Sequence, residues 1–200
     1  TTDTARLGNR SRQQAEIQSC APCHARRSPI ARTADPSKTF LDNYRPALLE
    51  HPLYYADGQV KEEDYEYASF LQSRMYEAGV TCSDCHNAHS LKQRGTDNNV
   101  CGHCHLPLTY DTPAHHFHKQ GTPAALCRNC HMRTTPYMVV DPRRDHSMRV
   151  PRVDYTAKYG IPNACTTPCH EDKPLEWAKD AIVKWYGPIR RRGNEYVAAF

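Results

Sequence analysis

The feature that most constrains this chain is a short motif, two cysteines followed directly by a histidine, which occurs five times. The motif is CAPCH at 20–24, CSDCH at 82–86, CGHCH at 101–105, CRNCH at 127–131 and CTTPCH at 165–170. The last copy has three residues between its cysteines where the others have two. All 10 cysteines fall within these motifs, so any fold must place every cysteine near one of five histidines.

Three chemistries use closely spaced cysteines. Cys82/Cys85 and Cys101/Cys104 are separated by fifteen residues, which is a zinc-ribbon spacing. Disulfides are conceivable in an exported chain with an even number of cysteines. Neither explains a histidine after every second cysteine, whereas this order is the attachment motif of c-type haem. We therefore predict five covalently bound c-type haems, with a Cys165–Cys169 disulfide as the alternative at the fifth motif.

The haem interpretation gives each motif residue a role. The two thiols form thioether bonds with the porphyrin vinyl groups, and the adjacent histidine binds the iron. The predicted thioether cysteines are Cys20, Cys23, Cys82, Cys85, Cys101, Cys104, Cys127, Cys130, Cys165 and Cys169. The predicted proximal iron ligands are His24, His86, His105, His131 and His170.

Seven further histidines are enough to give every iron a second imidazole. His89 follows His86 by three residues, which is too close to bind the same iron, so we predict that it reaches a neighbouring haem. His103 lies between two thioether cysteines and is predicted not to bind iron. In HHFH at 115–118, His116 could replace either neighbour. The predicted distal ligands are His51, His89, His115, His118 and His146.

The composition is unusual for a folded chain. Hydrophobic residues make up 38%, only 4 residues are Phe, and the mean hydropathy is −0.80, values that taken alone favour disorder. Five haems in 200 residues would supply the missing interior. We predict a mainly α fold with much irregular structure, in which covalent haems form the core of a single domain over 1–200, with a C-terminal helical segment at about 172–200.

Several elements are predicted from local pattern. Residues 4–19 are helix-compatible, 26–52 are Pro-rich and irregular, and 87–126 contain loops and short turns. Apolar residues at helical spacing predict one helix from Lys61 to Ala78, ended by Gly79. A brief strand is expected at Tyr137–Val140. A last helix is expected from about Pro174, capped by Asp172, to Gly187.

Charge and hydropathy restrict partners and location. No apolar run could span a bilayer, and the first residues, TTDTARLGNR, lack the features of a signal peptide, so we expect a soluble chain that is either processed or cut from something larger. The formal charge is +4, and the basic cluster 190–192 is interpreted as a solvated helix end, not a nucleic-acid site. Covalent haem attachment takes place outside the cytoplasm, so we expect a periplasmic or extracellular protein. Some arginines near the motifs are expected to pair with haem propionates: Arg26, Arg27, Arg128, Arg133, Arg143 and Arg144.

Four stretches carry a family resemblance: FLQSRMYEAGVTCSDCHNAHSLK, YDTPAHHFHKQG, CHMRTTPYMVVDPRRDHSMRVPR and PNACTTPCHEDKPLEWAKDAIVKWYG. From about Cys20 to Gly187, the chain resembles the haem region of multihaem c-type cytochromes that often carry a tetratricopeptide-repeat tail. The resemblance implies an exported, haem-packed electron-transfer protein and supports the predicted distal histidines. The chain departs from the family in its fifth motif and lacks both upstream motifs and the repeat tail. Compact chains of this kind also resemble extracellular cytochrome filaments, so self-association is a hypothesis.

The leading functional hypothesis is a pentahaem electron carrier with bis-histidine irons and redox partner proteins. The alternative is a multihaem oxidoreductase with one five-coordinate haem acting on a small nitrogen or sulfur compound. Such an enzyme needs an open iron position with acid–base groups over it. The seven additional histidines favour the carrier.

Overall fold

The computed structural model describes residues 9–63, 65–90, 92–167 and 169–188. Helices and turns dominate, and the strands are short. The helices are α1 (Arg10–His24), α2 (Phe40–Asn43), α3 (Tyr65–Leu71), α4 (Arg74–Glu77), α5 (Cys82–Cys85), α6 (Asn99–Gly102), α7 (Pro107–Tyr110), α8 (Pro113–His116), the 3-10 turn η1 (Pro123–Ala125), α9 (Cys127–His131), α10 (Val153–Tyr159) and α11 (Leu175–Tyr186). This agrees with the predicted helical fold with much irregular structure.

Three small antiparallel sheets join segments that are close in sequence. The strand pairs are β1 (Arg27–Pro29) with β2 (Tyr44–Pro46), β3 (His86–Asn87) with β4 (Lys92–Gln93), and β5 (Thr134–Tyr137) with β6 (Asp141–Arg144). Because the strands are short, each sheet only holds together the two ends of one loop. None of them provides a broad apolar face for packing.

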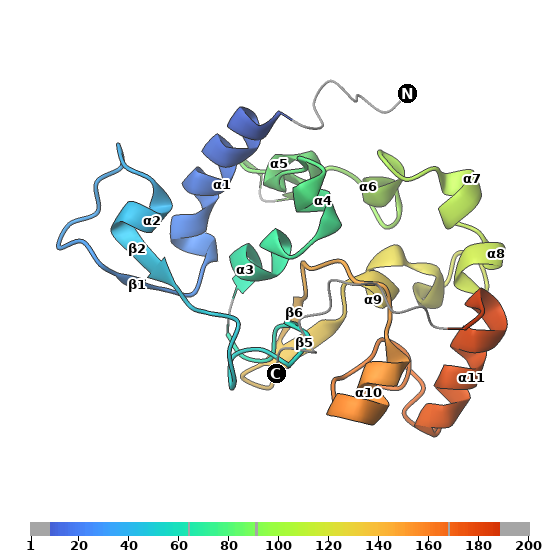
Figure 1. Cartoon of the computed structure of the whole chain (residues 1–200). Helices are drawn as coiled ribbons and strands as arrows, with labels where there is room; N and C mark the ends of the chain where they lie inside the picture. Colours follow the sequence, from blue (N-terminus) through green and yellow to red (C-terminus); the bar gives the residue numbers. More distant parts are fainter. Residues whose placement is uncertain (1–8, 64, 91, 168, 189–200) are drawn as a thin grey trace.

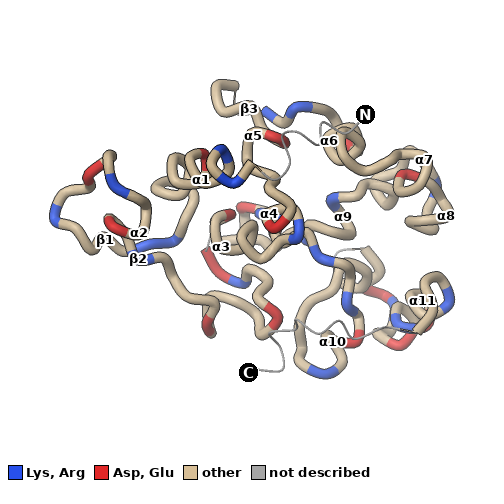
Figure 2. Tube along the Cα trace, turned by 45° about the horizontal axis from the view of Figure 1, so that its top comes forward, with Lys and Arg blue, Asp and Glu red and all other residues tan. Residues whose placement is uncertain are grey.

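The motifs lie on successive elements across the molecule. The first ends α1, the second begins with α5, the third begins in α6, the fourth forms α9, and the fifth lies in the turn before α11. Figure 1 shows α1 toward one end and α11 toward the other, with α5, α6 and α9 between them. Acidic and basic residues are interspersed along the trace in Figure 2.

The apolar interior is small and divided. One cluster packs Ala21, Ala25 and Phe40 against two tyrosines, and another joins Tyr155 and Ile161 near α10. Several buried residues are polar, including Gln13 and Ser73, which are fully enclosed. Protein side chains alone therefore form no continuous apolar core among the described residues, as the composition predicts.

The single helix predicted over Lys61–Ala78 is wrong. The chain forms α3 and α4 there, separated at Gln72–Ser73. Ser73 is the reason for the break, because its buried side chain accepts a hydrogen bond from the backbone N–H of Tyr76 and starts a new helix. Gly79, at φ +88°, follows α4 as expected.

Two smaller predictions also need correction. The expected strand at 137–140 ends at Tyr137, and Met138 and Val139 have positive φ at the exposed tip of the β5–β6 hairpin. Asp172 does not cap α11. Its carboxylate pairs with Lys173 at 2.9 Å, and Pro174 holds the N-cap position. The rest of the predicted C-terminal segment, 189–200, and the predicted helical residues 4–8 lie outside the described residues.

Candidate haem-binding sites

Each motif begins from a tight backbone turn. The backbone N–H of His86 donates to the carbonyl of Cys82, and that of His105 donates to the carbonyl of Cys101 at 2.9 Å. In the fifth motif the N–H of His170 donates to the carbonyl of Cys165 at 3.0 Å. This hydrogen bond spans one residue more than the corresponding bond in the other two motifs. The additional residue therefore widens the loop without opening it, and histidine and first cysteine keep the same backbone relationship.

The structure places three motif histidines opposite histidines from elsewhere in the chain. The ring centroids are 6.4 Å apart for His86 and His146, and 6.2 Å apart for His115 and His131. The centroids of His118 and His170 are 6.3 Å apart. Each pair joins one motif histidine to one of the predicted distal histidines.

This separation can be compared with that of two imidazoles on one metal ion. An imidazole nitrogen binds a transition metal at about 2 Å, and the ring centroid lies about 1 Å behind that nitrogen. Two imidazoles on opposite sides of one ion therefore have centroids about 6 Å apart. The three observed separations, 6.2 to 6.4 Å, fit an iron between the rings.

The ring nitrogens are oriented consistently. Nδ1 of His131 lies 2.8 Å from the carbonyl of Arg149, and Nδ1 of His146 lies 3.0 Å from the carbonyl of Arg144. Nδ1 of His118 bonds a backbone carbonyl two residues earlier. A hydrogen bond at Nδ1 fixes the ring and leaves Nε2 for a metal ion. These contacts suit ligation through Nε2.

The backbone of the HHFH segment directs two of its histidines to two different motifs. His115 lies in the last turn of α8, where it faces His131. Phe117 then adopts a left-handed conformation, φ 55°, which ends α8 and turns His118 toward His170. His116 is engaged at both ring nitrogens, since Nε2 lies 3.0 Å from Gln120 and Nδ1 accepts the N–H of His118. The geometry therefore favours His115 and His118 over His116.

A cavity marks the fifth motif. Both motif cysteines, Cys165 and Cys169, line it together with His118 and His170. Cofactor sites in proteins have mostly apolar walls with a few converging polar groups. Trp177 packs at 4.7 Å on the His170 ring and also lines the cavity. This site therefore brings together the thiols and imidazoles that haem attachment requires.

Burial keeps two of the motif thiols protonated. Burial raises the pKa of Cys82 to about 12 and that of Cys165 to about 11. Burial also lowers the pKa of His86 and His115, followed in each case by the charge of the facing histidine. These imidazoles are therefore neutral at physiological pH, the form that binds a metal ion.

Neighbouring motifs contact each other in sequence order. The thiols of Cys20 and Cys82 share a hydrogen bond, and α1 is also tied to α5 by an Arg12–Asp84 ion pair of 2.7 Å. The second and third motifs are close enough that the charge of Cys104 helps to raise the pKa of Cys85, after burial and Asp84.

The third and fourth motifs meet through a second thiol pair, Cys101 and Cys127. The side chain of Asn98 also accepts the N–H of Cys127 at 2.9 Å. The fourth and fifth motifs are linked through His115 and His118, three residues apart, which face one motif each. The five motifs therefore form a row from first to fifth.

Comparison with known proteins gives one informative likeness. No protein-family model matches the chain, and no curated protein matches it. A solved structure, that of the outer cell wall cytochrome OcwA, resembles it with a TM-score of 0.58 and 17% sequence identity. The chain has a cytochrome-like fold. The likeness covers 84% of this chain and 51% of that one, so the chain spans about half the length of OcwA.

The described residues do not favour the other cysteine chemistries. All ten cysteines are free thiols, so Cys165 and Cys169 form no disulfide. In the described ranges, no group of three or more cysteine, histidine or acidic side chains is placed to hold a metal ion without a porphyrin. The zinc-ribbon spacing at residues 82–104 is therefore not accompanied by zinc-site geometry.

Two motif histidines have no facing histidine at this distance within the described residues. His24 and His105 are both exposed, as are the predicted distal ligands His51 and His89. The ring of His105 instead contacts Tyr110 edge-on at 5.7 Å. The three facing pairs, by contrast, are all half-buried.

Most of the arginines expected to pair with propionates bind protein groups, and two of them, Arg133 and Arg144, lie close to the fourth motif. Arg133 is 7% exposed and donates to the carbonyl of Thr134 and the hydroxyl of Thr135. Arg144 donates to the carbonyls of Arg128 and Met132, which ties β6 to α9. Their role in the described structure is to hold the loops around the fourth motif.

Proposed function

We propose that this chain is a multihaem c-type cytochrome that carries electrons along a row of five bis-histidine haems. The observation that carries the proposal is the set of three facing histidine pairs, each joining a motif to a distant part of the chain at the separation that an iron between them requires. Fold likeness to a cytochrome supports the same assignment.

The residues divide into three roles. The ten motif cysteines attach the porphyrins, and the five motif histidines bind one side of each iron. His146, His115 and His118 bind the opposite sides for the second, fourth and fifth motifs. When bound, each haem supplies reversible one-electron iron chemistry.

The remaining two irons require His51 and His89. The N–H of Ala47 bonds the carbonyl of Arg26 at 2.9 Å, which ties the segment before His51 to the residues just after His24. We therefore assign His51 to the first motif. His89 follows the second motif, whose Cys85 is near Cys104 of the third. We assign His89 to the iron of His105.

Two protein-bound imidazoles on each iron leave no open position for a substrate, so the chain acts as a carrier. The contact order of the motifs gives the path, with the first and fifth motifs at its ends. Partners that donate or accept electrons are expected at these ends. No helix in the described ranges is long and apolar enough to cross a membrane. Export to the periplasm or cell surface follows from where covalent haem attachment occurs.

The rival proposal is an oxidoreductase with one five-coordinate haem. It is favoured at two motifs, the first and the third, whose exposed histidines His24 and His105 have no facing histidine in the described part of the chain. Self-association into a conducting filament is a further form of the carrier role, in which a second subunit would supply a missing ligand.

Haem content and electron paramagnetic resonance (EPR) spectra test the proposal together. A protein matured with its haems should contain five per chain, and its oxidised form should give only low-spin ferric signals. Four haems, with the peptide that contains Cys165 and Cys169 unmodified in mass, would show that the widened fifth motif is not used. A stoichiometric high-spin signal would contradict the all-bis-histidine carrier and favour the enzyme, with nitrite and hydroxylamine turnover as the next measurements.

A further inference from the structure

A carboxylate contacts the first motif histidine. Nδ1 of His24, at the end of α1, lies 3.1 Å from Oε2 of Glu66, in the first turn of α3. The 42 residues between them include the β1–β2 hairpin. Because Nδ1 takes this contact, Nε2 stays available for an iron, as in the paired histidines.

The acceptor at His24 differs from those recorded at His131 and His146. Nδ1 of His131 and Nδ1 of His146 each bond a neutral backbone carbonyl. A carboxylate is a stronger acceptor than a carbonyl, because it carries a full negative charge. An acceptor at the outer ring nitrogen raises the basicity of an iron-bound imidazole, and a charged one raises it further.

We propose that Glu66 is a positioning residue that gives the haem at the first motif the lowest reduction potential of the five. This inference rests on the proposed function. A more basic imidazole and a nearby negative charge both stabilise ferric over ferrous iron. Since the first motif is one end of the row, a low potential there favours electron entry at that end.

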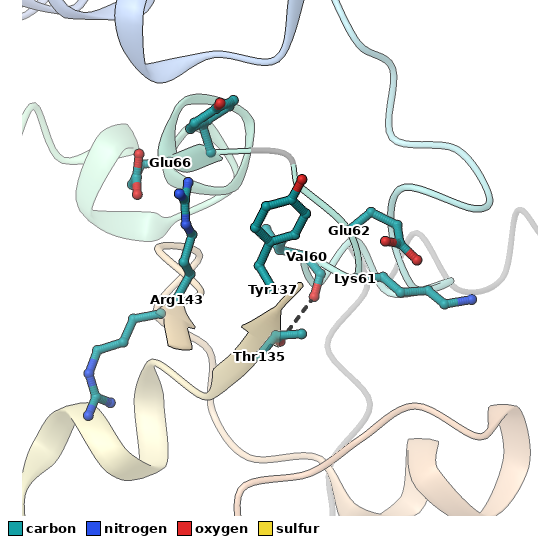
Figure 3. A pocket seen from close by; sticks show the side chains of 9 residues that line it. Val60, Lys61, Glu62, Glu66, Thr135, Tyr137 and Arg143 are labelled. Carbon is teal, nitrogen blue, oxygen red and sulfur yellow. Dashed lines mark hydrogen bonds between the residues drawn. The ribbon is translucent and has the colours of Figure 1, made fainter. Parts of the chain in front are cut away.

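The surroundings of Glu66 leave its carboxylate available to His24. The neighbouring acid, Glu63, accepts hydrogen bonds from the hydroxyls of Tyr65 at 2.9 Å and Tyr137 at 2.7 Å. Arg143 lies between those two rings, 5.1 Å and 5.5 Å from their centroids. In Figure 3, Arg143 and Glu66 line the same pocket.

The positive charge of Arg143 attracts Glu66, but Arg143 does not replace His24 as the hydrogen-bond partner of the Glu66 carboxylate. Its guanidinium bonds Asp141 at 2.8 Å, while the charge of Glu66 contributes to raising the Arg143 pKa, after the bond and charge of Asp141. The arginine is therefore held on β6 by its own carboxylate partner, and the described structure records no hydrogen bond between it and Glu66. This leaves the histidine contact as the defined interaction of the Glu66 carboxylate.

The test is an EPR-monitored redox titration of the haem-loaded protein and two variants. Glu66→Gln keeps the side-chain shape but removes the charge. We expect the lowest of the five midpoint potentials to rise, with at least a tenfold gain in the equilibrium constant for reduction, which equals 59 mV for one electron. The g values of that same low-spin signal should change. The charge of Glu66 also acts on His86, so the second-motif haem should shift in potential by less, and the other three signals should not change.

Glu62→Gln is the matched control, because Glu62 is exposed, lines the same pocket and does not contact His24. It should leave the lowest potential and its g values unchanged. Equal shifts in both variants, or no shift in Glu66→Gln, would overturn the inference. Glu66→Asp keeps the charge but shortens the side chain, and it should also raise that potential. It serves as the second test variant if Glu66→Gln folds poorly. Five low-spin haems in each sample would show that the proposed function stands whatever the outcome.

Discussion

His118 and His170 face each other with ring centroids 6.3 Å apart, across a cavity that Cys165 and Cys169 also line. Trp185 contacts the His118 ring at 6.0 Å and stacks on Phe117 at 4.8 Å. The motif with the irregular spacing therefore has a facing imidazole and aromatic walls. An inserted residue alone is not a reason to exclude a haem from it.

The first prediction separates His118 from its neighbour His116. In the haem-loaded protein, His118→Ala should convert one of five low-spin haems to high-spin, because the iron of His170 loses its second imidazole. His116→Ala should keep all five low-spin, since Nε2 of His116 is engaged by Gln120. EPR of the oxidised variants measures both. High-spin iron in His116→Ala, with none in His118→Ala, would reverse the assignment.

The second prediction concerns the additional residue of the fifth motif. Deleting the exposed Thr167 restores two residues between the cysteines and should leave five haems per chain. The backbone bond from His170 to Cys165 should simply change to the span seen between His105 and Cys101. Intact mass and haem content measure the result. Loss of one haem on deletion would show that the wider loop is required at this site.

The third prediction concerns His24 and His105, the two motif histidines that have no facing histidine in the described ranges. His51→Ala and His89→Ala should each produce one high-spin haem, at the first and third motifs respectively. His103→Ala is the control, because His103 is an exposed residue between two motif cysteines. EPR spin quantification distinguishes the three variants. If His51→Ala stays fully low-spin, the first iron takes its second ligand elsewhere, and the spectrum should be repeated at high dilution to test for a neighbouring subunit.

The motif residues could be predicted from sequence because covalent chemistry fixes their order and spacing. The pairs of facing histidines could not be predicted from sequence. His86 and His146 meet only because the β5–β6 hairpin and the loop held by Arg144 return the chain to α5. The choice within HHFH depends on one left-handed residue, Phe117.

Other features had no sequence signal at all. Ser73 breaks a helix that side-chain periodicity favours, since a buried cap outweighs a continued apolar stripe. Glu66 has no motif spacing to His24, and their contact requires α1 and α3 to pack together. The order of the motifs in space likewise depends on long-range contacts such as Arg12–Asp84.

The fourth prediction concerns how the first two motifs are held together. Arg12 and Asp84 lie 2.7 Å apart with side chains 23% and 19% exposed, and the hydrogen bond to Asp84 raises the Arg12 pKa. A double-mutant cycle with alanine should give a coupling energy of about 1 kcal/mol in the free energy of unfolding. The exposed Asp172–Lys173 pair should give no measurable coupling. Equal couplings would show that the α1–α5 contact is no more than a surface ion pair.

The last prediction uses the acid dependence of Glu63. Hydrogen bonds from Tyr137 and then Tyr65 hold the pKa of this carboxyl below its usual range. A carboxyl with a depressed folded-state pKa stabilises the protein above its unfolded pKa, about 4.3, and this contribution is lost as the pH falls through the folded pKa.

Glu63→Gln should therefore lower the urea midpoint at pH 7, and the difference from the wild type should shrink below about pH 4. Glu62→Gln, which changes an exposed acid one residue away, should show no such pH-dependent difference. Urea unfolding of the three proteins at several pH values measures this. A Glu63→Gln difference that stays constant down to pH 2 would mean that the two tyrosine hydroxyls stabilise the α3–β5 junction regardless of the charge they bind.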